Sequence, residues 1–253
     1  MKKQPLKISF CTQKGGVGKS TMTTLLSSIL HYRMGYNVMV MDCDFPQHSI
    51  SKMRERDKKN VMGNELHKRM VINQFQTINK KGYPIIRTKP SDALEKAAEL
   101  VETSVVKPDV IFFDLPGTAN TEGVLTTLKA MDLLLLPMTA DRLVVESTLS
   151  FAQAFISLPE TESANSQQVM WLYWNQVDGR EKTSLYESYE YVIKKLGLSM
   201  MESRLSDSKR FRKESDYIGK YVFRSTLLPA HPRLMKSAGL DLFVDEFIKI
   251  SNL

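Results

Sequence analysis

The sequence predicts an α/β fold in which a doubly wound, mostly parallel sheet lies between two layers of helices, a three-layer α/β/α arrangement. Several short runs are apolar at nearly every position, as expected for strands that are buried on both faces of a sheet. Each run is followed by a stretch of helical length and pattern. Strands that alternate with helices in this way form parallel sheets covered on both sides. No Gly-, Pro- or Ser-rich linker interrupts the chain, so we expect one domain over residues 1–253.

The first strand, the first helix and the second strand form one βαβ unit. Residues 7–12 (KISFCT) are mostly apolar and end in a glycine-rich turn, which leads into a helical pattern over 20–34. Gly35 stands where a helix C-cap glycine is expected, and residues 37–41 (NVMVM) form a second buried strand that ends at Asp42.

The rest of the chain continues the alternation. Residues 51–81 are rich in charged side chains and predict surface helices. Further strands are expected at 84–87, 110–113, 133–137 and 169–174. Further helices are expected at 92–104, capped by Ser91, and at 144–156, 184–196 and 241–250. Ligands of such sheets bind beyond the carboxyl ends of the strands, so the loops after Thr12, Met41, Phe113 and Trp174 should converge on one site.

Composition excludes several classes of protein. The chain is 42% hydrophobic and 25% charged, as in ordinary globular domains. It has no apolar run long enough for a signal peptide or a membrane span, which favours a cytoplasmic setting. Cys11 and Cys43 lie in apolar segments without the spacing of a disulfide framework or a zinc site. The formal charge of +7 favours an anionic partner such as nucleic acid.

A phosphate-binding loop follows the first strand. In residues 14–21 (KGGVGKST), glycines let consecutive N–H groups turn toward one anion, and the helix that follows adds its dipole. Lys19 can reach the β- and γ-phosphates, and Ser20 can ligate Mg²⁺. Gln13 replaces the first glycine of the strict pattern, but the strand before and the helix after favour a P-loop NTPase over a glycine-rich turn that binds nothing. The expected nucleotide contacts are Gly15, Gly16, Val17, Gly18, Lys19, Ser20 and Thr21.

The second lysine of this loop, Lys14, makes it resemble the deviant Walker A motif of the ParA/MinD family of ATPases. The resemblance implies that Lys14 reaches across a dimer that sandwiches two ATP molecules and contacts the partner subunit's phosphates. Residues 42–47 (DCDFPQ) resemble the family's Asp-x-Asp-x-Pro-Gln switch I segment. This similarity implies that Asp44 orients the attacking water and that Asp42 supports the Mg²⁺ shell.

Three later segments extend the resemblance. Asp114 ends a buried strand and would be the Walker B carboxylate that holds Mg²⁺ through a water, with the Gly117 N–H available to the γ-phosphate. Asn175 matches the family's adenine-binding position, although capping of the loop with Asp178 and Gly179 is an equal alternative. Residues 228–234 (LPAHPRL) resemble the stretch that closes over the base, and only Pro229, Arg233 and Leu234 match it.

The resemblance covers residues 7–50, 84–150 and 169–247 and omits 51–83. Within the family, the chain is most similar to the short ParA-like ATPases carried by conjugative transposons. The resemblance implies an ATP-dependent homodimer, slow hydrolysis, and stimulation by a ParB-like protein or another partner from the conjugation machinery.

Basic residues late in the chain favour nonspecific DNA binding, which would associate the protein with the nucleoid. Family members that move DNA bind the duplex in their ATP state, and phosphate contacts of this kind read no sequence. The candidates are Lys209, Arg210, Arg212, Lys213 and Arg233, within a larger set that includes Arg204, Lys220 and Arg224. A solvated basic face is the alternative for this cluster. The alternative function is an ATP-switched module that docks a conjugation protein without binding DNA.

The C-terminal pattern argues against a membrane partner. Residues 241–250 have an apolar face, but the polar face is mainly acidic and would be repelled by anionic lipid. We therefore expect this helix to pack on the core.

Overall fold

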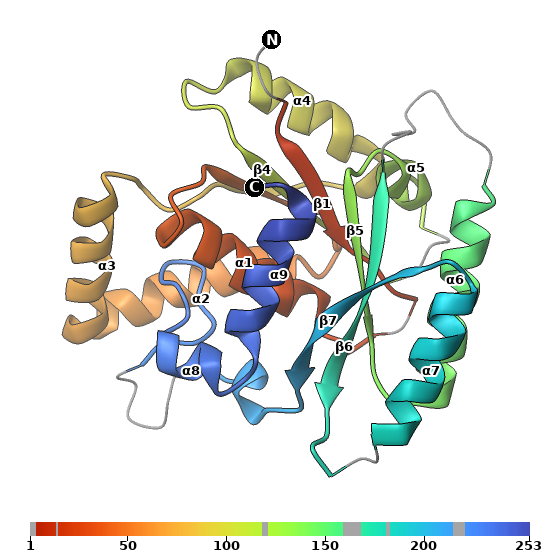
Figure 1. Ribbon diagram of the computed structural model, residues 1–253. Helices are drawn as coiled ribbons and strands as arrows, with labels where there is room; N and C mark the ends of the chain where they lie inside the picture. The colour runs from red at the N-terminus through yellow and green to blue at the C-terminus, as the bar shows by residue number, and fades with distance from the viewer. Residues whose placement is uncertain (1–3, 14, 118–120, 159–167, 181–182, 215–220) are drawn as a thin grey trace.

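The computed structural model describes residues 4–13, 15–117, 121–158, 168–180, 183–214 and 221–253, without the side chains of residues 183 and 212. Within these ranges, seven parallel strands form one sheet in the order β3-β2-β4-β1-β5-β6-β7 (Figure 1). The strands are β1 (Leu6–Phe10), β2 (Val38–Asp42), β3 (Ile85–Arg87), β4 (Val110–Asp114), β5 (Leu133–Met138), β6 (Val169–Val177) and β7 (Ser199–Ser206). The predicted doubly wound α/β fold is confirmed.

Helices cover both faces of the sheet. One face packs against α1 (Lys19–Tyr32), α2 (Ser49–Gly63), α8 (Pro232–Lys236) and α9 (Leu240–Ser251). The other packs against α4 (Ala93–Thr103), α5 (Val124–Lys129), α6 (Arg142–Ile156) and α7 (Thr183–Lys195). The helix α3 (Glu65–Ile78) lies outside these layers and packs on α2, as the left side of Figure 1 shows.

The central strands are apolar throughout because they are buried on both faces. In β4, Val110 and Phe112 point into the core beneath α1, whereas Ile111 and Phe113 point into the core beneath α4 and α5. All four side chains are almost fully buried. This arrangement explains why continuous apolar runs predicted β1, β2, β4 and β5 close to their observed bounds.

The strand β7 and the short helices α5 and α8 were not predicted. β7 forms the edge of the sheet and buries Met201 and Leu205, while Glu202 is exposed, so it lacks a continuous apolar run. The predicted cap at Ser91 is wrong. Ser91 lies in a 3₁₀ turn, η1 (Pro90–Asp92), and its hydroxyl lies 2.6 Å from Oδ1 of Asp92 instead of capping α4.

The closing helix α9 packs on the core, as predicted. Its own side chains Leu240, Phe243, Val244 and Phe247 are buried against the sheet. The carboxylate of Glu246 accepts hydrogen bonds from the N–H groups of two β7 residues, at 2.7 and 2.8 Å. Within the described ranges, no helix is both long and apolar enough to cross a bilayer.

Candidate functional site

The glycine-rich loop after β1 leaves open space in front of the first turn of α1. Gly16 and Gly18 have left-handed backbone angles, with φ of 78° and 90°, which favour glycine. A Cβ added at Gly15 or Gly16 would meet no atom within 4 Å. Gly18 is the N-cap of α1, and no described side chain caps this end. The N–H groups of the first turn are therefore available to an anion.

The end of β6 holds this loop in place. The buried side chain of Asn175 donates from Nδ2 to the Val17 carbonyl at 2.8 Å and accepts from the Gln176 N–H at 2.9 Å. Gln176 has a left-handed φ of 55°, and its amide nitrogen donates to the Gly16 carbonyl at 3.2 Å. Asn175 thus contacts both the P-loop and the residue that follows it.

Two buried carboxylates lie side by side beneath the loop, because Asp42 and Asp114 end paired strands in direct register. Burial raises the pKa of Asp114 to about 7, the Ser20 hydroxyl and Lys19 partly oppose the rise, and Asp42 and Asp44 add to it. Among the described residues, no donor meets hydrogen-bond geometry at either oxygen of Asp114 or at Oδ1 of Asp42. The Ser20 hydroxyl nevertheless lies near enough to lower the pKa of Asp114, and Nδ1 of His48 lies 3.8 Å from Oδ1 of Asp42.

Unpaired buried carboxylate oxygens are costly unless a cation or water satisfies them. These oxygens, with the Ser20 hydroxyl nearby, suit a hydrated Mg²⁺ that takes its remaining ligands from phosphate oxygens. The predicted metal residues Ser20, Asp42 and Asp114 are therefore brought together, and their chemistry fits the ion.

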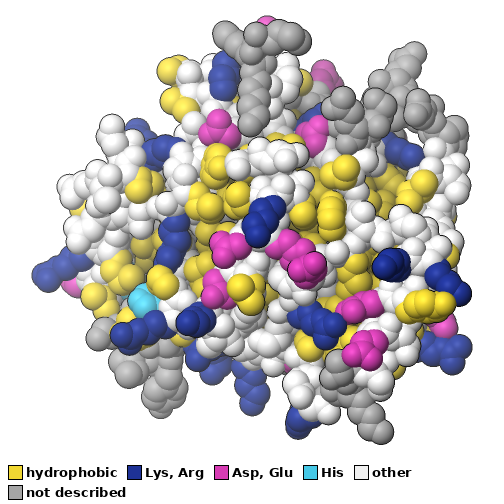
Figure 2. All heavy atoms as spheres, in the orientation of Figure 1, with side chains coloured by type: hydrophobic (Ala, Val, Ile, Leu, Met, Phe, Trp, Pro, Cys, Tyr) yellow, Lys and Arg dark blue, Asp and Glu magenta, His cyan; other side chains and the backbone are white. Residues whose placement is uncertain are grey.

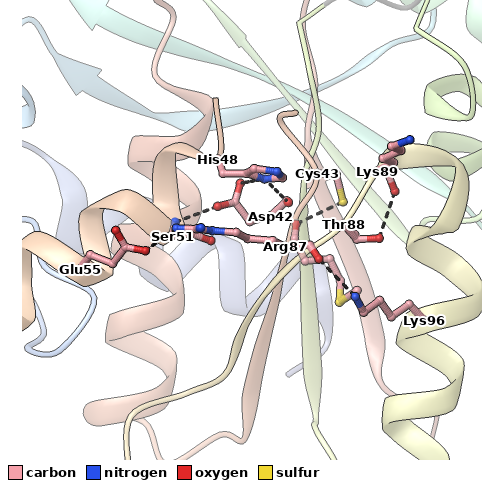
Figure 3. A network of polar contacts seen from close by, with 10 residues as sticks. Asp42, Cys43, His48, Ser51, Glu55, Arg87, Thr88, Lys89 and Lys96 are labelled. Carbon is pink, nitrogen blue, oxygen red and sulfur yellow. Dashed lines mark hydrogen bonds and ion pairs between the residues drawn. The ribbon is translucent and has the colours of Figure 1, made fainter. Parts of the chain in front are cut away.

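A polar network ties Asp42 to α2, as Figure 3 shows. Oδ2 of Asp42 accepts from the Ser51 N–H at 2.8 Å, and Nδ1 of His48 lies 3.0 Å from the Asp42 carbonyl. Farther along α2, Glu55 pairs with Arg87 on β3 at 2.5 Å. His48 was missed by the sequence analysis, and only its place between the switch segment and the helix could have indicated it.

Asp44, the predicted water-orienting residue, is half-buried near the same edge. Burial raises the pKa of its carboxyl, Lys19 opposes the rise, and Asp42 adds to it. Lys19 is close enough to both Asp44 and Asp114 to act on their charges. The loops after β1, β2, β4 and β6 therefore converge, as predicted.

A cavity of about 280 Å³ opens beside the P-loop. It is lined by Gly16, Gly18, Thr21, Met22, Asn175, Gln176, Ser206, Asp207, Ser208, Phe211 and Arg224. The segment after β7 supplies one wall, which the sequence analysis missed because β7 itself was not predicted.

Pro229 does not line this cavity, although it was expected to contact the base. Its neighbour Leu228 packs with Val71 and Leu227, and the Ala230 carbonyl accepts from the Arg33 guanidinium at 2.5 Å. Residues 228–230 therefore lie against α1 and α3. The segment that borders the cavity is the one after β7.

The predicted DNA-binding residues lie on two short helices. Lys209 and Lys213 are exposed and Arg210 is half-buried, at or beside the 3₁₀ helix η2 (Lys209–Arg212). Arg233 is exposed on α8. In Figure 2, Lys and Arg side chains lie along the lower edge of the molecule. In Figure 1, drawn in the same orientation, the β6 and β7 arrowheads point toward that edge.

Two other basic residues of the larger set are engaged inside the protein. Arg204 donates to Glu190 at 2.7 Å and lies over the Tyr186 ring, while Arg224 faces the cavity. Lys14, Thr118, Asn120, Lys220 and the side chain of Arg212 lie outside the described residues. Gly117 follows β4 directly before that gap.

Both cysteines lie buried at the ends of strands near this edge. Cys11 and Cys43 are buried and free. Burial raises the pKa of both thiols, that of Cys11 to about 12, so both are neutral near neutral pH. Their state agrees with the absence of a disulfide or metal pattern in the sequence.

Comparison with known structures finds relatives of the same fold at low sequence identity. A putative plasmid partition protein from Borrelia burgdorferi bound to AMPPNP is 20% identical, with a TM-score of 0.54 and coverage of 86% of this chain and 95% of that chain. The structure of pNOB8 ParA bound to nonspecific DNA is 17% identical, with a TM-score of 0.53 and coverage of 78% and 79%. The MinC:MinD cell division complex of Aquifex aeolicus is 14% identical, with a TM-score of 0.60 and coverage of 98% and 96%.

A search of curated protein sequences finds no match. The model of the CobQ/CobB/MinD/ParA nucleotide binding domain matches residues 8–217, which contain the P-loop, both buried carboxylates and Asn175. That match spans most of the chain, and the chain therefore belongs to the CobQ/CobB/MinD/ParA family of nucleotide-binding proteins.

Proposed function

We propose that the protein is a Mg²⁺-dependent ATPase that dimerises around ATP, binds DNA nonspecifically in that state and releases it after hydrolysis. The observation that carries this proposal is the open P-loop facing two buried carboxylates with unpartnered oxygens, at the same edge as an exposed basic segment. The biological role would be partition or transfer of a plasmid or conjugative element, as in the short ParA-like ATPases of conjugative transposons.

The chain's own residues would act by positioning and charge neutralisation. The P-loop N–H groups from Gly15 to Thr21 bind the phosphates, and Lys19 stabilises the charge that develops on them. Ser20, Asp42 and Asp114 hold Mg²⁺, which neutralises phosphate charge when bound. Asp44 orients the attacking water, and the Gly117 N–H contacts the γ-phosphate.

Two further residues would contact the base and the partner subunit. Asn175 borders the cavity that would receive adenine. Its hydrogen bond to the Val17 carbonyl holds the P-loop beside that cavity. Lys14 would reach the second subunit's phosphates, which makes ATP a requirement for the dimer. A ParB-like or conjugation protein would stimulate an otherwise slow hydrolysis.

DNA would be bound through phosphate contacts from Lys209, Arg210, Arg212, Lys213 and Arg233. The exposure of Lys209, Lys213 and Arg233 supports this role, as does the net charge of +7. Such contacts position a protein on the duplex without reading its sequence.

A second candidate function is docking of a protein partner without DNA. The observation that favours it is the outer surface of the α2–α3 pair. Met62, Leu66 and Ile72 are exposed there, with exposed fractions of 75%, 49% and 45%, in a region that carries none of the nucleotide-binding motifs. Exposed apolar side chains on otherwise charged helices favour protein contacts.

The test is binding to a labelled duplex of arbitrary sequence with ATP, with ADP and without nucleotide, across a salt series. Binding only with ATP, lost steeply as salt rises, is the expected result. Equal binding in all three states, or none, would contradict the DNA-carrier function and favour the docking module.

A further inference from the structure

Arg224 spans the cavity beside the P-loop, and no sequence motif predicted a role for it there. Its Nη1 donates to Oγ1 of Thr21, in the first turn of α1, at 3.1 Å. The same nitrogen donates to the Phe211 carbonyl, in η2, at 3.0 Å. One guanidinium therefore joins the phosphate-binding helix α1 to the basic segment Lys209–Lys213.

The guanidinium retains capacity for a further partner. Its Nε is buried and has no hydrogen-bond partner among the described residues. Burial, the largest cause, lowers the pKa of Arg224, and Glu214 opposes this effect. Because Arg224 lines the cavity, an acceptor oxygen there that reaches its terminal nitrogens would offset the cost of burying this cation.

The basic segment is held by the chain around Arg224. The rings of Phe211 and Phe223 meet edge to face with centroids 5.3 Å apart, and the Glu214 carbonyl accepts from the N–H groups of Phe223 and Arg224 at 2.9 and 3.2 Å. Packed rings and backbone hydrogen bonds therefore connect Arg224 to η2.

The other end of this connection is fixed. Asp57 of α2 accepts hydrogen bonds from the Thr226 N–H and hydroxyl, both at 2.6 Å, and Tyr32 of α1 donates to the Thr226 carbonyl at 2.9 Å. The residues after Arg224 are therefore anchored on α1 and α2.

We propose that Arg224 is a positioning residue that couples nucleotide in the cavity to the placement of the basic segment Lys209–Lys213. A ribose or phosphate oxygen of the nucleotide accepts from the guanidinium, which holds η2 against the P-loop helix. This inference rests on the proposed nucleotide site and names how nucleotide binding would regulate the DNA-binding surface.

The experiment is limited trypsin digestion of the full chain with saturating Mg·ATP and without nucleotide, with cleavage after Lys209, Arg210 and Lys213 followed by mass spectrometry. In the wild type, we expect ATP to slow cleavage at these bonds by about fivefold or more, the lower end of ordinary coupling factors. In Arg224→Gln, under ATP concentrations shown to saturate it by fluorescent-nucleotide titration, cleavage should become independent of ATP.

Arg56→Gln is the matched control. Arg56 pairs at 3.2 Å with Glu214, the residue that follows the basic segment, but does not line the cavity. ATP should therefore protect the basic segment of Arg56→Gln from cleavage as it does in the wild type. If Arg224→Gln is too unstable to digest selectively, Arg224→Lys keeps the positive charge without the forked donors and should lose protection likewise.

The digestion needs no DNA, so its outcomes separate this inference from the proposed function. ATP protection that persists in Arg224→Gln or Arg224→Lys, or that is absent from a nucleotide-bound wild type, would overturn the coupling. Normal protection in a wild type that binds no duplex would overturn DNA binding and leave the coupling in place. Failure of the wild type to bind nucleotide would overturn both.

Discussion

The phosphate side and the base side of the site are built in different ways. On the phosphate side, one continuous segment supplies the loop and the start of α1, and strands paired in register supply Asp42 and Asp114. On the base side, the cavity walls come from the end of β6, the segment after β7 and Arg224. Each part of the phosphate side lies in a short segment with a recognisable sequence pattern, whereas most of the base side has no such pattern.

The two sides also differ in how well their polar groups are paired. The phosphate side keeps buried carboxylate oxygens without partners, a cost that a bound cation would remove. On the base side, Asn175 and Gln176 already hydrogen-bond the P-loop. We therefore expect substitutions on the phosphate side to abolish chemistry and substitutions on the base side to weaken binding by graded amounts.

The largest effect is expected for Lys19→Ala. Loss of the ammonium removes charge stabilisation at the phosphates, and turnover at saturating Mg·ATP should fall by about 10³-fold. Lys58→Ala, at an exposed position on α2, is the control. Steady-state phosphate release measures both, and an unchanged rate in Lys19→Ala would remove the P-loop from the catalytic site.

Asp114→Asn should stabilise the nucleotide-free protein at high pH. The pKa of Asp114 in the folded state, about 7, lies above its usual value. The folded state therefore binds the proton more tightly, so this stabilisation is present below pH 4 and is lost as pH rises through 7. Asn stays neutral, and we expect it to recover up to about 4 kcal/mol at pH 8.

Thermal unfolding in EDTA from pH 5 to 8 measures this effect. The melting temperature of Asp114→Asn should exceed that of the wild type at pH 8, and the difference should shrink toward pH 5. Asp245→Asn, at an exposed position on α9, should show no such trend. A lower melting temperature for Asp114→Asn at every pH would contradict the claim that the buried charge of Asp114 destabilises the nucleotide-free protein.

Asn175→Ala should weaken ATP and ADP binding to a similar extent. The substitution removes the bond to the Val17 carbonyl and a polar wall of the cavity, and we expect a loss of about tenfold, or about 1.4 kcal/mol. Asn73→Ala, at an exposed position on α3, is the control. Competition against a fluorescent nucleotide measures the loss; a change for ATP alone would place Asn175 on the phosphate side instead.

The smallest effect is expected for Lys209→Gln with Lys213→Gln. If both ammonium groups contact phosphates, the slope of log affinity for duplex against log salt should fall by about 2 per protomer. The matched control is Lys58→Gln with Lys59→Gln, two exposed lysines on α2. An equal fall in both pairs would indicate a general charge effect and not a defined interface.

The sequence could predict the phosphate side because its physics is local. Short segments of sequence show the glycines of the loop, the helix that follows and the aspartates at strand ends. The φ angles of 78° and 90° at Gly16 and Gly18 agree with the choice of glycine there. On the base side, Asn175 was predicted and lines the cavity, but the rest could not be predicted, because Arg224 reaches Thr21 across the fold and β7 shows the weak pattern of an edge strand. The motif expected at 228–234 shows this limit, since Pro229 lies outside the cavity.

The central claim is that the unpartnered oxygens of Asp114 and Asp42 await a Mg²⁺ that arrives with the nucleotide. It is tested most directly by calorimetric titration of ATP into the wild type and Asp114→Asn, each with Mg²⁺ and with EDTA. We predict that Mg²⁺ strengthens ATP binding in the wild type and has little effect in Asp114→Asn. An equal gain from Mg²⁺ in both proteins, or no gain in the wild type, would contradict the account.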